Sequence, residues 1–223
     1  MLRGKFSVEK ARRLQLRLAA RVVKEDMLPR TIRYVAGVDV SYSGEWAFGV
    51  VSLHDYESLK LVEARRAKVK TTLPYIPTFL SFRELRPSVA AINKLETQPD
   101  VFLVDAQGIA HRYRIGFASH LGVFLDEPTI GVAKSLLCGQ VQPKSRAGWS
   151  PITDKGEIVG AQLEHKRGKP LYVSIGHKVT LERAIEVVEH CTRTNRLPEP
   201  IRNAHILATE AMKRHKQEIT HQS

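Results

Sequence analysis

The sequence predicts a mixed α/β fold in a single domain, and three observations indicate it. Its 223 residues suit one domain with a substantial core. Three strand-like segments come first, joined by short, turn-rich separators, which predict antiparallel neighbours because a parallel crossover needs about a dozen residues or more. Helical and strand-like segments then alternate, as in strand–helix–strand units. We therefore expect a mixed sheet rather than an all-parallel one.

The first part of the chain predicts a helix, a three-stranded meander and a second helix. In residues 8–26, apolar side chains recur at helical spacing and basic ones fall largely on other faces, as in an amphipathic helix whose expected apolar face is Val8, Ala11, Leu14, Leu18 and Val22. The next strands are IRYVAGVDVSY, EWAFGVVSL and KLVEARRAKVK. Pro74 and Pro77 then stiffen a loop, and a helix begins near Thr78 or Ser81.

The second part of the chain predicts buried strands and closing helices. Two apolar runs are typical of buried strands, DVFLVDA and PTIGVAKS, and the end of a helix at HLGVFLD separates them. Later strands are IVGAQLEH and PLYVSIG, followed by helices at TLERAIEVVEHC and from Pro200 onward. We expect disorder after about residue 215. This order fits the ribonuclease H-like architecture, a mixed sheet with flanking helices in a single domain over residues 1–223.

Composition excludes several classes of protein. With 43% hydrophobic and 26% charged residues and no uninterrupted apolar stretch near the length of a membrane span, the chain resembles a soluble protein that does not enter a membrane. Its basic start has no apolar core followed by a small-residue cleavage site, so it is not a secretory signal. Cys138 and Cys191 lie far apart and outside any paired metal spacing, which favours a reducing, cytoplasmic location.

The strongest compositional signal is the charge. A formal net charge of +12 and a pI near 9.9 favour a polyanionic partner and oppose self-association, so we expect a monomer. Nucleic acid is the leading partner. The alternatives are a merely basic protein and an anionic membrane surface.

Three acidic side chains stand out by position. Asp39 lies in an otherwise apolar strand, where an unpaired carboxylate is expensive to bury. Asp105 ends the apolar run VFLV, and Glu84 lies in the helix after the proline loop. If the first and fourth strands are neighbours, Asp39 and Asp105 face each other, and the covering helix supplies Glu84. The alternative is acids placed by chance, with Glu84 paired to Arg83 or Arg86 on the helix surface.

Carboxylates that converge without cations repel one another severely. Mg²⁺ removes that repulsion, because it prefers carboxylate oxygens and keeps several waters for substrate phosphates. Two such ions, about 3.5–4 Å apart, would stabilise the attacking and leaving oxygens of a phosphodiester displacement. The pattern is therefore compatible with a metal site for phosphodiester hydrolysis, and chance placement of the acids stays the alternative.

Longer motifs give the chain a family resemblance. GVDVSY, PYIPTFLSFREL, DVFLVDAQGIAHR, GFASHLGVFLDEPTIGVAKSLLCG, VSIGHKVTLERAIEVV and LPEPIRNAHILA occur in the order seen in endonuclease V, the deoxyinosine 3′-endonuclease family. The match covers most of residues 8–208. The resemblance implies a DNA-repair nuclease that recognises deoxyinosine, a product of adenine deamination, and cuts the second phosphodiester 3′ to it, leaving 3′-hydroxyl and 5′-phosphate ends. The alternatives are an inosine-specific endoribonuclease on the same scaffold, a binding protein that has lost cleavage, and an architectural basic protein.

The resemblance also implies the catalytic residues and the cofactor. The family's metal-binding carboxylates fall on Asp39, Glu84 and Asp105, its active-site lysine on Lys134 and its active-site histidine on His205. Mg²⁺ is the implied cofactor, and Mn²⁺ is a substitute for it. Lys134 would supply a compact cation near the scissile group, and His205 would orient or deprotonate the water. From the residues alone, a solvated lysine and a packed helix-face histidine are the alternatives.

The proline loop resembles the family's strand-separating wedge, which falls on Pro74, Tyr75, Ile76 and Pro77. On a stiffened backbone, Tyr75 and Ile76 would insert into the base stack and hold the gap left by an extruded base. The alternative is a rigid turn that packs Tyr75 on the core.

The family's lesion pocket falls on four positions, Thr78, Ala106, Gly108 and His111. Thr78 and Ala106 stand where the family usually has glycine, so side-chain atoms occupy places where the backbone would approach the base. We expect glycine at either place to alter base preference and to lower stability slightly. The stretch AHRYR replaces an AHPRR-like one, so a basic contact with the substrate either disappears or moves to Arg112 or Arg114.

Overall fold

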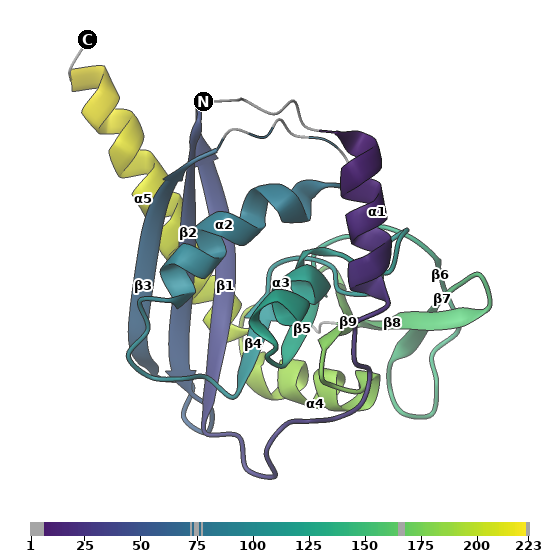
Figure 1. The fold of residues 1–223 in the computed structure, drawn as a ribbon. Coiled ribbons are helices and arrows are strands. Elements are labelled where there is room, and N and C mark those ends of the chain that lie inside the picture. The colour runs from purple at the N-terminus through teal and green to yellow at the C-terminus, as the bar shows by residue number, and fades with distance from the viewer. Residues whose placement is uncertain (1–6, 72, 74–75, 77, 165–167, 222–223) are drawn as a thin grey trace.

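The protein folds around one mixed, nine-stranded sheet with helices on both faces (Figure 1). The computed structural model describes residues 7–71, 73, 76, 78–164 and 168–221. The strand order is β3-β2-β1-β4-β5-β9-β8-β7-β6. The ribonuclease H-like mixed sheet with flanking helices that the sequence predicts is confirmed.

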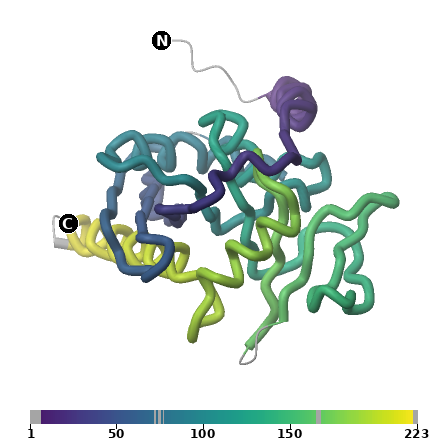
Figure 2. The backbone as a smooth tube through the Cα atoms, turned by 90° about the horizontal axis from the view of Figure 1, so that it is seen from below, coloured from purple at the N-terminus to yellow at the C-terminus, as the bar shows by residue number. Residues whose placement is uncertain are grey.

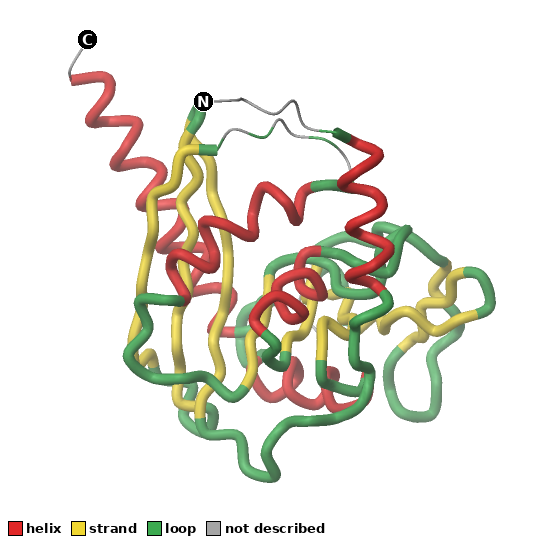
Figure 3. Tube along the Cα trace, in the orientation of Figure 1, coloured by secondary structure: helices red, strands yellow, loops and turns green. Residues whose placement is uncertain are grey.

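The elements follow one another as helix, meander and alternating units (Figure 3). The strands are β1 (Tyr34–Ser43), β2 (Trp46–Asp55), β3 (Leu61–Lys70), β4 (Val101–Val104), β5 (Thr129–Ala133), β6 (Gln140–Val141), β7 (Ser150–Asp154), β8 (Glu157–Leu163) and β9 (Leu171–His177). The helices are α1 (Val8–Ala19), α2 (Leu80–Ile92), α3 (Phe117–Leu125), α4 (Leu181–Cys191) and α5 (Glu199–His221). No helix in the described ranges is both long and apolar enough to cross a membrane.

The strand pairing matches the expected mixture of directions. β1, β2 and β3 form the antiparallel meander, and β4 then pairs parallel with β1. β5 lies parallel to β4, and the strands from β9 outward are antiparallel. The first and fourth strands are therefore neighbours, as the candidate site requires.

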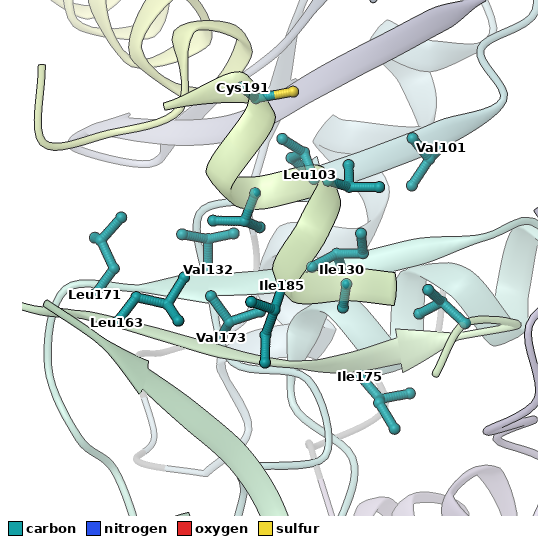
Figure 4. Packing of buried hydrophobic residues seen from close by; sticks show 14 of the residues in the cluster. Val101, Leu103, Ile130, Val132, Leu163, Leu171, Val173, Ile175, Ile185 and Cys191 are labelled. Carbon is teal, nitrogen blue, oxygen red and sulfur yellow. The ribbon is translucent and has the colours of Figure 1, made fainter. Parts of the chain in front are cut away.

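The core has a layer on each face of the sheet. One cluster joins the strands to α2 and α3 through residues such as Val38, Phe102 and Leu121. The other joins them to α4 and the start of α5, with Leu103, Ile130, Val173 and Ile185 among its members (Figure 4). Figures 1 and 2 show α1 on the side of α2 and α3, away from α4 and α5.

Close backbone contacts set the position of α5. A Cβ added to Gly37 in β1 would lie 2.1 Å from the carbonyl carbon and oxygen of Pro200, so only glycine allows this approach. The Ser52 hydroxyl donates to the Pro200 carbonyl at 2.7 Å, and the Ser41 hydroxyl donates to the Ala208 carbonyl at 2.5 Å. The first turns of α5 are therefore fixed over β1 and β2.

The structure differs from the predicted elements in four places. The opening helix ends at Ala19 rather than near residue 26, and its buried residues are Ala11 and Gln15, while Leu14 is exposed. The short strands β6 and β7 are additions, and β7 carries Pro151, which weakens a strand pattern. The last helix begins at Glu199 instead of Pro200. It continues to His221, past the position after which we expected disorder.

Candidate active site

Two aspartates lie side by side where β1 and β4 part. The parallel ladder ends with the pair Val38 and Val104, and the Asp105 backbone N–H still donates to the Val38 carbonyl at 3.1 Å. Asp39 follows Val38 within β1, and Asp105 follows Val104 directly after the end of β4. Their side chains are 14% and 9% exposed. Sheet register alone therefore brings these carboxylates together, at the carboxyl ends where open α/β sheets bind ligands.

His205 completes a group of three potential metal ligands. One ligand atom from each of Asp39, Asp105 and His205 lies within 4.8 Å of the others. His205 extends from α5, and its Nδ1 lies 2.8 Å from Asp39 Oδ2. That hydrogen bond raises the pKa of His205 above its ordinary value. Ala204 and Ala208 face the sheet beside it, and their small side chains let α5 approach β1 closely.

Lys134 follows β5 directly and lies against the same carboxylates. Its Nζ donates to Asp105 Oδ2 at 2.5 Å. An Arg196 guanidinium nitrogen donates to the Lys134 carbonyl at 2.9 Å and to the Pro170 carbonyl at 2.7 Å. Arg196 thus holds the Lys134 backbone, a role that no sequence motif indicated. The name carboxylate end is used below for Asp39, Asp105, Lys134 and His205.

Glu84 is not one of the three clustered ligands, but it is close enough to Asp39 and Asp105 for their charges to act on it. It is partly buried on α2, which packs on the opposite face of the sheet from α5. Burial, and then the charges of Asp39 and Asp105, raise its pKa well above the ordinary range. Among the described residues no ion pair joins Glu84 to Arg83 or Arg86, and the charge of Arg83 only partly offsets the rise in the Glu84 pKa.

The residues present fit a divalent cation. Burial and the charge of Asp39 raise the pKa of Asp105 even though Lys134 lies beside it. One lysine therefore does not balance the negative charge gathered here. Carboxylate oxygens are the ligands that Mg²⁺ and Mn²⁺ prefer, and an imidazole nitrogen is acceptable to the second.

A cavity opens directly beside the carboxylate end. Its volume is about 330 Å³, within the range of ligand pockets. Its lining is Thr78, Leu80, Ser81, Asp105, Ala106, Gln107, His111, Ile115, Gly116, Phe117, Ala133, Lys134, Ser135 and Leu137. Asp105 and Lys134 are shared with the carboxylate end, so the cavity and the carboxylates form one continuous site. We call this space the lesion cavity, after the lesion pocket that the family resemblance implies here.

The structure brings three of the four predicted pocket residues to the lesion cavity. Thr78, Ala106 and His111 line it. Gly108 does not, because it packs against β9, where an added Cβ would lie 2.0 Å from the Ile175 carbonyl oxygen. Of the predicted wedge, Ile76 is partly buried outside the lining, and Pro74, Tyr75 and Pro77 lie outside the described residues.

Thr78 and Ala106 differ in backbone conformation. Thr78 has a φ of 69°, in the left-handed region that β-branched residues rarely adopt. Ala106 is not among the described residues with positive φ. Glycine at position 78 would adopt the positive φ without strain. Glycine at position 106 would only leave more room in the cavity.

His111 is buried and neutral. Burial, together with the positive charges of Arg12 and Arg114, lowers its pKa to about 4. The Tyr113 backbone N–H donates to its Nδ1 at 3.3 Å. Because Nδ1 accepts, the neutral ring carries its proton on Nε2.

The two arginines near His111 have different surroundings. Arg114 donates to Asp154 at 2.8 Å and to Glu157 at 2.9 Å, so it anchors the β7–β8 hairpin. Arg112 is exposed. A basic contact displaced from position 113 is therefore available from Arg112 rather than from Arg114.

The sequence analysis missed Gln107. Its amide donates to the Ser135 carbonyl at 2.8 Å and so ties the loop after β4 to the loop after β5 across the cavity. Its place within the quoted motif DVFLVDAQGIAHR was the only signal for it.

Comparison with known proteins gives consistent matches. A family model described as endonuclease V matches residues 16–206. Endonuclease V from Thermofilum pendens is 45% identical over 206 residues, which cover 92% of this chain and 88% of that protein. The crystal structure of endonuclease V from Streptomyces avermitilis has 32% sequence identity and a TM-score of 0.89, covering 97% of this chain and 98% of that one.

Some of the similar structures contain nucleic acid. Ciona intestinalis endonuclease V was crystallised with a 24mer DNA that contains an inosine followed by a ribo-adenosine. It is 32% identical to this chain, with a TM-score of 0.84, and covers 93% of this chain and 98% of its own. The similarity therefore extends over both the sheet and its flanking helices.

Proposed function

The chain belongs to the endonuclease V family, and we propose that it is a metal-dependent DNA-repair endonuclease for deoxyinosine. It hydrolyses the second phosphodiester bond 3′ to the lesion and leaves 3′-hydroxyl and 5′-phosphate ends. One observation carries the proposal, which is that Asp105 and Lys134 belong both to the carboxylate end and to the lining of the lesion cavity. A base held in that cavity directs the strand on its 3′ side to the groups that cleave, so that the second phosphodiester bond, one nucleotide beyond the lesion, is the bond cut.

Each residue of the carboxylate end has a role in this proposal. Asp39 and Asp105 hold the cation, and Glu84 adds negative charge from α2. When bound, Mg²⁺ or Mn²⁺ activates water and neutralises the charge that develops on the phosphate. Lys134 adds a compact positive charge beside Asp105. His205 keeps Nδ1 on Asp39, so its Nε2 is left to orient the attacking water or accept its proton.

Recognition of the base belongs to the walls of the lesion cavity. Neutral His111 has a proton on Nε2 to donate to an acceptor on the edge of hypoxanthine, and its burial keeps that proton state over the working pH range. Tyr75 and Ile76 of the wedge fill the gap that the extruded base leaves.

An inosine-specific endoribonuclease is the second candidate. The Ciona intestinalis protein was crystallised with a strand in which a ribonucleotide follows the inosine, so a ribose at that position is compatible with this fold. Paired strands that carry inosine followed by deoxyadenosine or by adenosine discriminate the two functions. Faster cleavage of the ribose-containing strand favours the ribonuclease.

The test of the main proposal is a cleavage assay with defined ends. Labelled duplexes carrying one inosine, one uracil, one mismatch or no lesion are incubated with and without Mg²⁺. We expect cleavage only with the cation and preferentially beside inosine, with a 3′ end that a polymerase extends and a 5′ end that a ligase joins. Equal cleavage of the undamaged duplex, or cleavage in excess chelator, contradicts the proposal.

The charge and the cysteines support a monomer that works in the cytoplasm. The net charge of +12 opposes self-association and favours the polyanionic substrate. Cys138 and Cys191 are free thiols. Light scattering at low and at physiological salt measures the molar mass in solution. A mass above that of one chain at both salt concentrations would contradict the monomer.

A further inference from the structure

Arg12 on α1 connects two loops that are distant in sequence. One guanidinium nitrogen donates to Gln15 Oε1 at 2.7 Å, and another donates to Thr78 Oγ1 at 3.2 Å. Its central carbon lies 3.4 Å from the centroid of the Tyr113 ring and 4.5 Å from that of Phe79. A planar guanidinium is suited to such a combination of directed hydrogen bonds and ring contacts.

Contacts from α1 hold Thr78 in an unfavourable backbone conformation. The φ of Thr78 is 69°, a conformation that a β-branched residue keeps only when its surroundings impose it. Gln15, which is fully buried, donates its amide to the Thr78 carbonyl at 2.6 Å, while Arg12 holds the side chain. Helix α1 therefore fixes both the peptide and the hydroxyl of Thr78.

The same arginine reaches the opposite wall of the lesion cavity. Tyr113 lies under the guanidinium, and its backbone N–H donates to His111 Nδ1. Thr78 and His111 both line the cavity, one from the loop before α2 and the other from the loop after β4. Arg12 itself is not part of the lining. It therefore acts on the cavity through other residues.

We propose that Arg12 is a positioning residue for base selection, which sets the spacing of the Thr78 and His111 walls by holding Thr78 and Tyr113. The inference rests on the proposed function, because it concerns which base the lesion cavity accepts. Hydrogen bonds to the edge of a base form only at short range. If one wall of the cavity moves away, the correct base loses its hydrogen bonds and other bases are accepted more easily. Chemistry at the carboxylate end depends on the β1–β4 register and on α5, whereas the hydrogen bonds and ring contacts given above for Arg12 are with α1 and with the loops before α2 and after β4.

The test compares two neighbouring arginines of α1. Arg12→Met keeps an unbranched side chain and removes the guanidinium, whereas Arg13→Met removes the same charge from a side chain that is 62% exposed and pairs with Glu9 of its own helix. Arg12→Lys restores the charge without the fork or the planar face. For each variant, KM and kcat are measured on inosine, xanthine and uracil strands.

We expect Arg12→Met to raise KM for the inosine strand about tenfold, to reduce the preference for inosine, and to leave kcat within about threefold of the wild type. Arg12→Lys should behave like Arg12→Met, because charge alone does not hold the walls. Arg13→Met should leave the ratios among the three strands unchanged. Identical ratios in the wild type and Arg12→Met overturn the inference, as does full recovery by Arg12→Lys.

A double-mutant cycle keeps the inference testable if Arg12→Met folds poorly. Tyr113→Leu removes the ring under the guanidinium, a ring whose centroid is also 6.0 Å from that of His111, and position 113 lies outside the cavity lining. We expect it to shift base preference in the same direction, and the Arg12→Met/Tyr113→Leu double variant to add little more, since both changes break the same interaction. An unchanged preference in Tyr113→Leu, or a double effect equal to the sum of the single ones, overturns the inference.

Binding to undamaged DNA separates this role from direct binding of Arg12 to a phosphate. If the Arg12 guanidinium neutralised a phosphate, Arg12→Met would weaken binding to every sequence equally and lower the salt slope by about one. That outcome overturns the inference. Failure of the wild type to cut inosine strands would instead refute the proposed function, whereas wild-type cleavage with unaltered selectivity in the Arg12 variants would refute only the role of Arg12.

Discussion

The carboxylate end and the lesion cavity meet at Asp105 and Lys134, yet they are built in different ways. Asp39 and Asp105 are placed by backbone hydrogen bonds between paired strands, which continue as far as the Asp105 N–H. Thr78, on the cavity wall, is held by side-chain contacts from α1, to a residue 66 positions away in sequence. The difference indicates that the groups proposed for chemistry are on a rigid scaffold, whereas the cavity wall proposed to read the base can change without disturbing them.

The two regions also have opposite electrostatic character. At the carboxylate end and on nearby α2, burial and mutual repulsion raise the pKa of Asp105 and of Glu84, so folding without a cation favours their protonated forms. Their contribution to stability is therefore greatest at low pH and is lost as pH rises. In the lesion cavity, the pKa of His111 is lowered to about 4, and its contribution is lost as pH falls. One region gathers negative charge, which suits a cation, whereas burial and nearby arginines keep the His111 side chain of the other neutral.

The largest expected effect is loss of cleavage at the carboxylate end. Asp39→Asn and Asp105→Asn should each lower the Mg²⁺-dependent single-turnover rate by at least about a thousandfold, because the cation loses a ligand and the phosphate loses its charge neutralisation. Circular dichroism should show a retained fold. The control is Glu9→Gln, an exposed acid on α1 whose loss should leave the rate unchanged. Rates near that of the wild type in both aspartate variants would show that these carboxylates do not hold the catalytic cation.

A smaller effect is expected from disturbing the support beneath His205. Gly37→Ala places a Cβ 2.1 Å from the Pro200 carbonyl, so α5 must shift away from β1 and carry His205 with it. We expect a loss of about 2–3 kcal/mol in the free energy of unfolding, with reduced cleavage. Urea denaturation measures the free energy of unfolding, and the single-turnover rate measures cleavage.

The control for Gly37→Ala is Gly44→Ala. Gly44 has a φ of 57° and no atom within 4 Å of an added Cβ, so its substitution costs only backbone strain of about 1–2 kcal/mol and should leave the rate intact. If both substitutions lower the cleavage rate equally, the close approach of α5 to β1 does not position His205.

The carboxylate end could be predicted from the sequence for a physical reason. Asp39 and Asp105 interrupt apolar runs, and the short connections of the meander leave β1 free to pair with the next buried strand. Sheet periodicity and register then determine that the two side chains meet. The family motifs added Lys134 and His205, whose proximity to the aspartates depends on how β5 and α5 pack rather than on local spacing.

The lesion cavity could not be predicted in the same way. The apolar periodicity of α1 suggested a hydrophobic face that includes Leu14, but the helix buries Gln15 to bond the Thr78 carbonyl. Neither the positive φ of Thr78 nor the contact of Arg12 with Tyr113 leaves a pattern in the sequence, because each depends on residues far apart. The roles of Tyr75 and Ile76 as a wedge stay predictions.

The pH dependence of stability is the third expected difference. In the unfolded chain the His111 imidazole has its ordinary pKa of 6.5 and takes up a proton below that pH. In the folded chain its pKa is about 4, so it stays neutral until the pH approaches 4. Stability should therefore fall between these values, by about 2 kcal/mol at pH 5 from this residue. His111→Gln should show a smaller loss between pH 7.5 and pH 5 in urea denaturation. His190→Gln, which replaces an exposed imidazole on α4, is the control and should keep the wild-type loss.

The smallest expected effect separates the two glycine replacements on the wall of the lesion cavity. Thr78→Gly relieves a left-handed conformation that costs a β-branched residue about 1–2 kcal/mol, and this gain exceeds or equals the entropy cost of about 0.4–1 kcal/mol. Ala106→Gly relieves no such strain and incurs only the entropy cost. Thr78→Gly also removes the hydroxyl that accepts from Arg12, at a cost of about 0.5–1.5 kcal/mol. Its free energy of unfolding should therefore change little, whereas Ala106→Gly should show the slight loss that the sequence predicts for both positions. Both should alter the ratio of inosine to uracil cleavage more than turnover at saturating substrate, because both side chains line the cavity. If the two variants lose stability equally and keep the wild-type ratio, neither side chain touches the base, and the difference between a fixed carboxylate end and an adjustable cavity wall has to be abandoned.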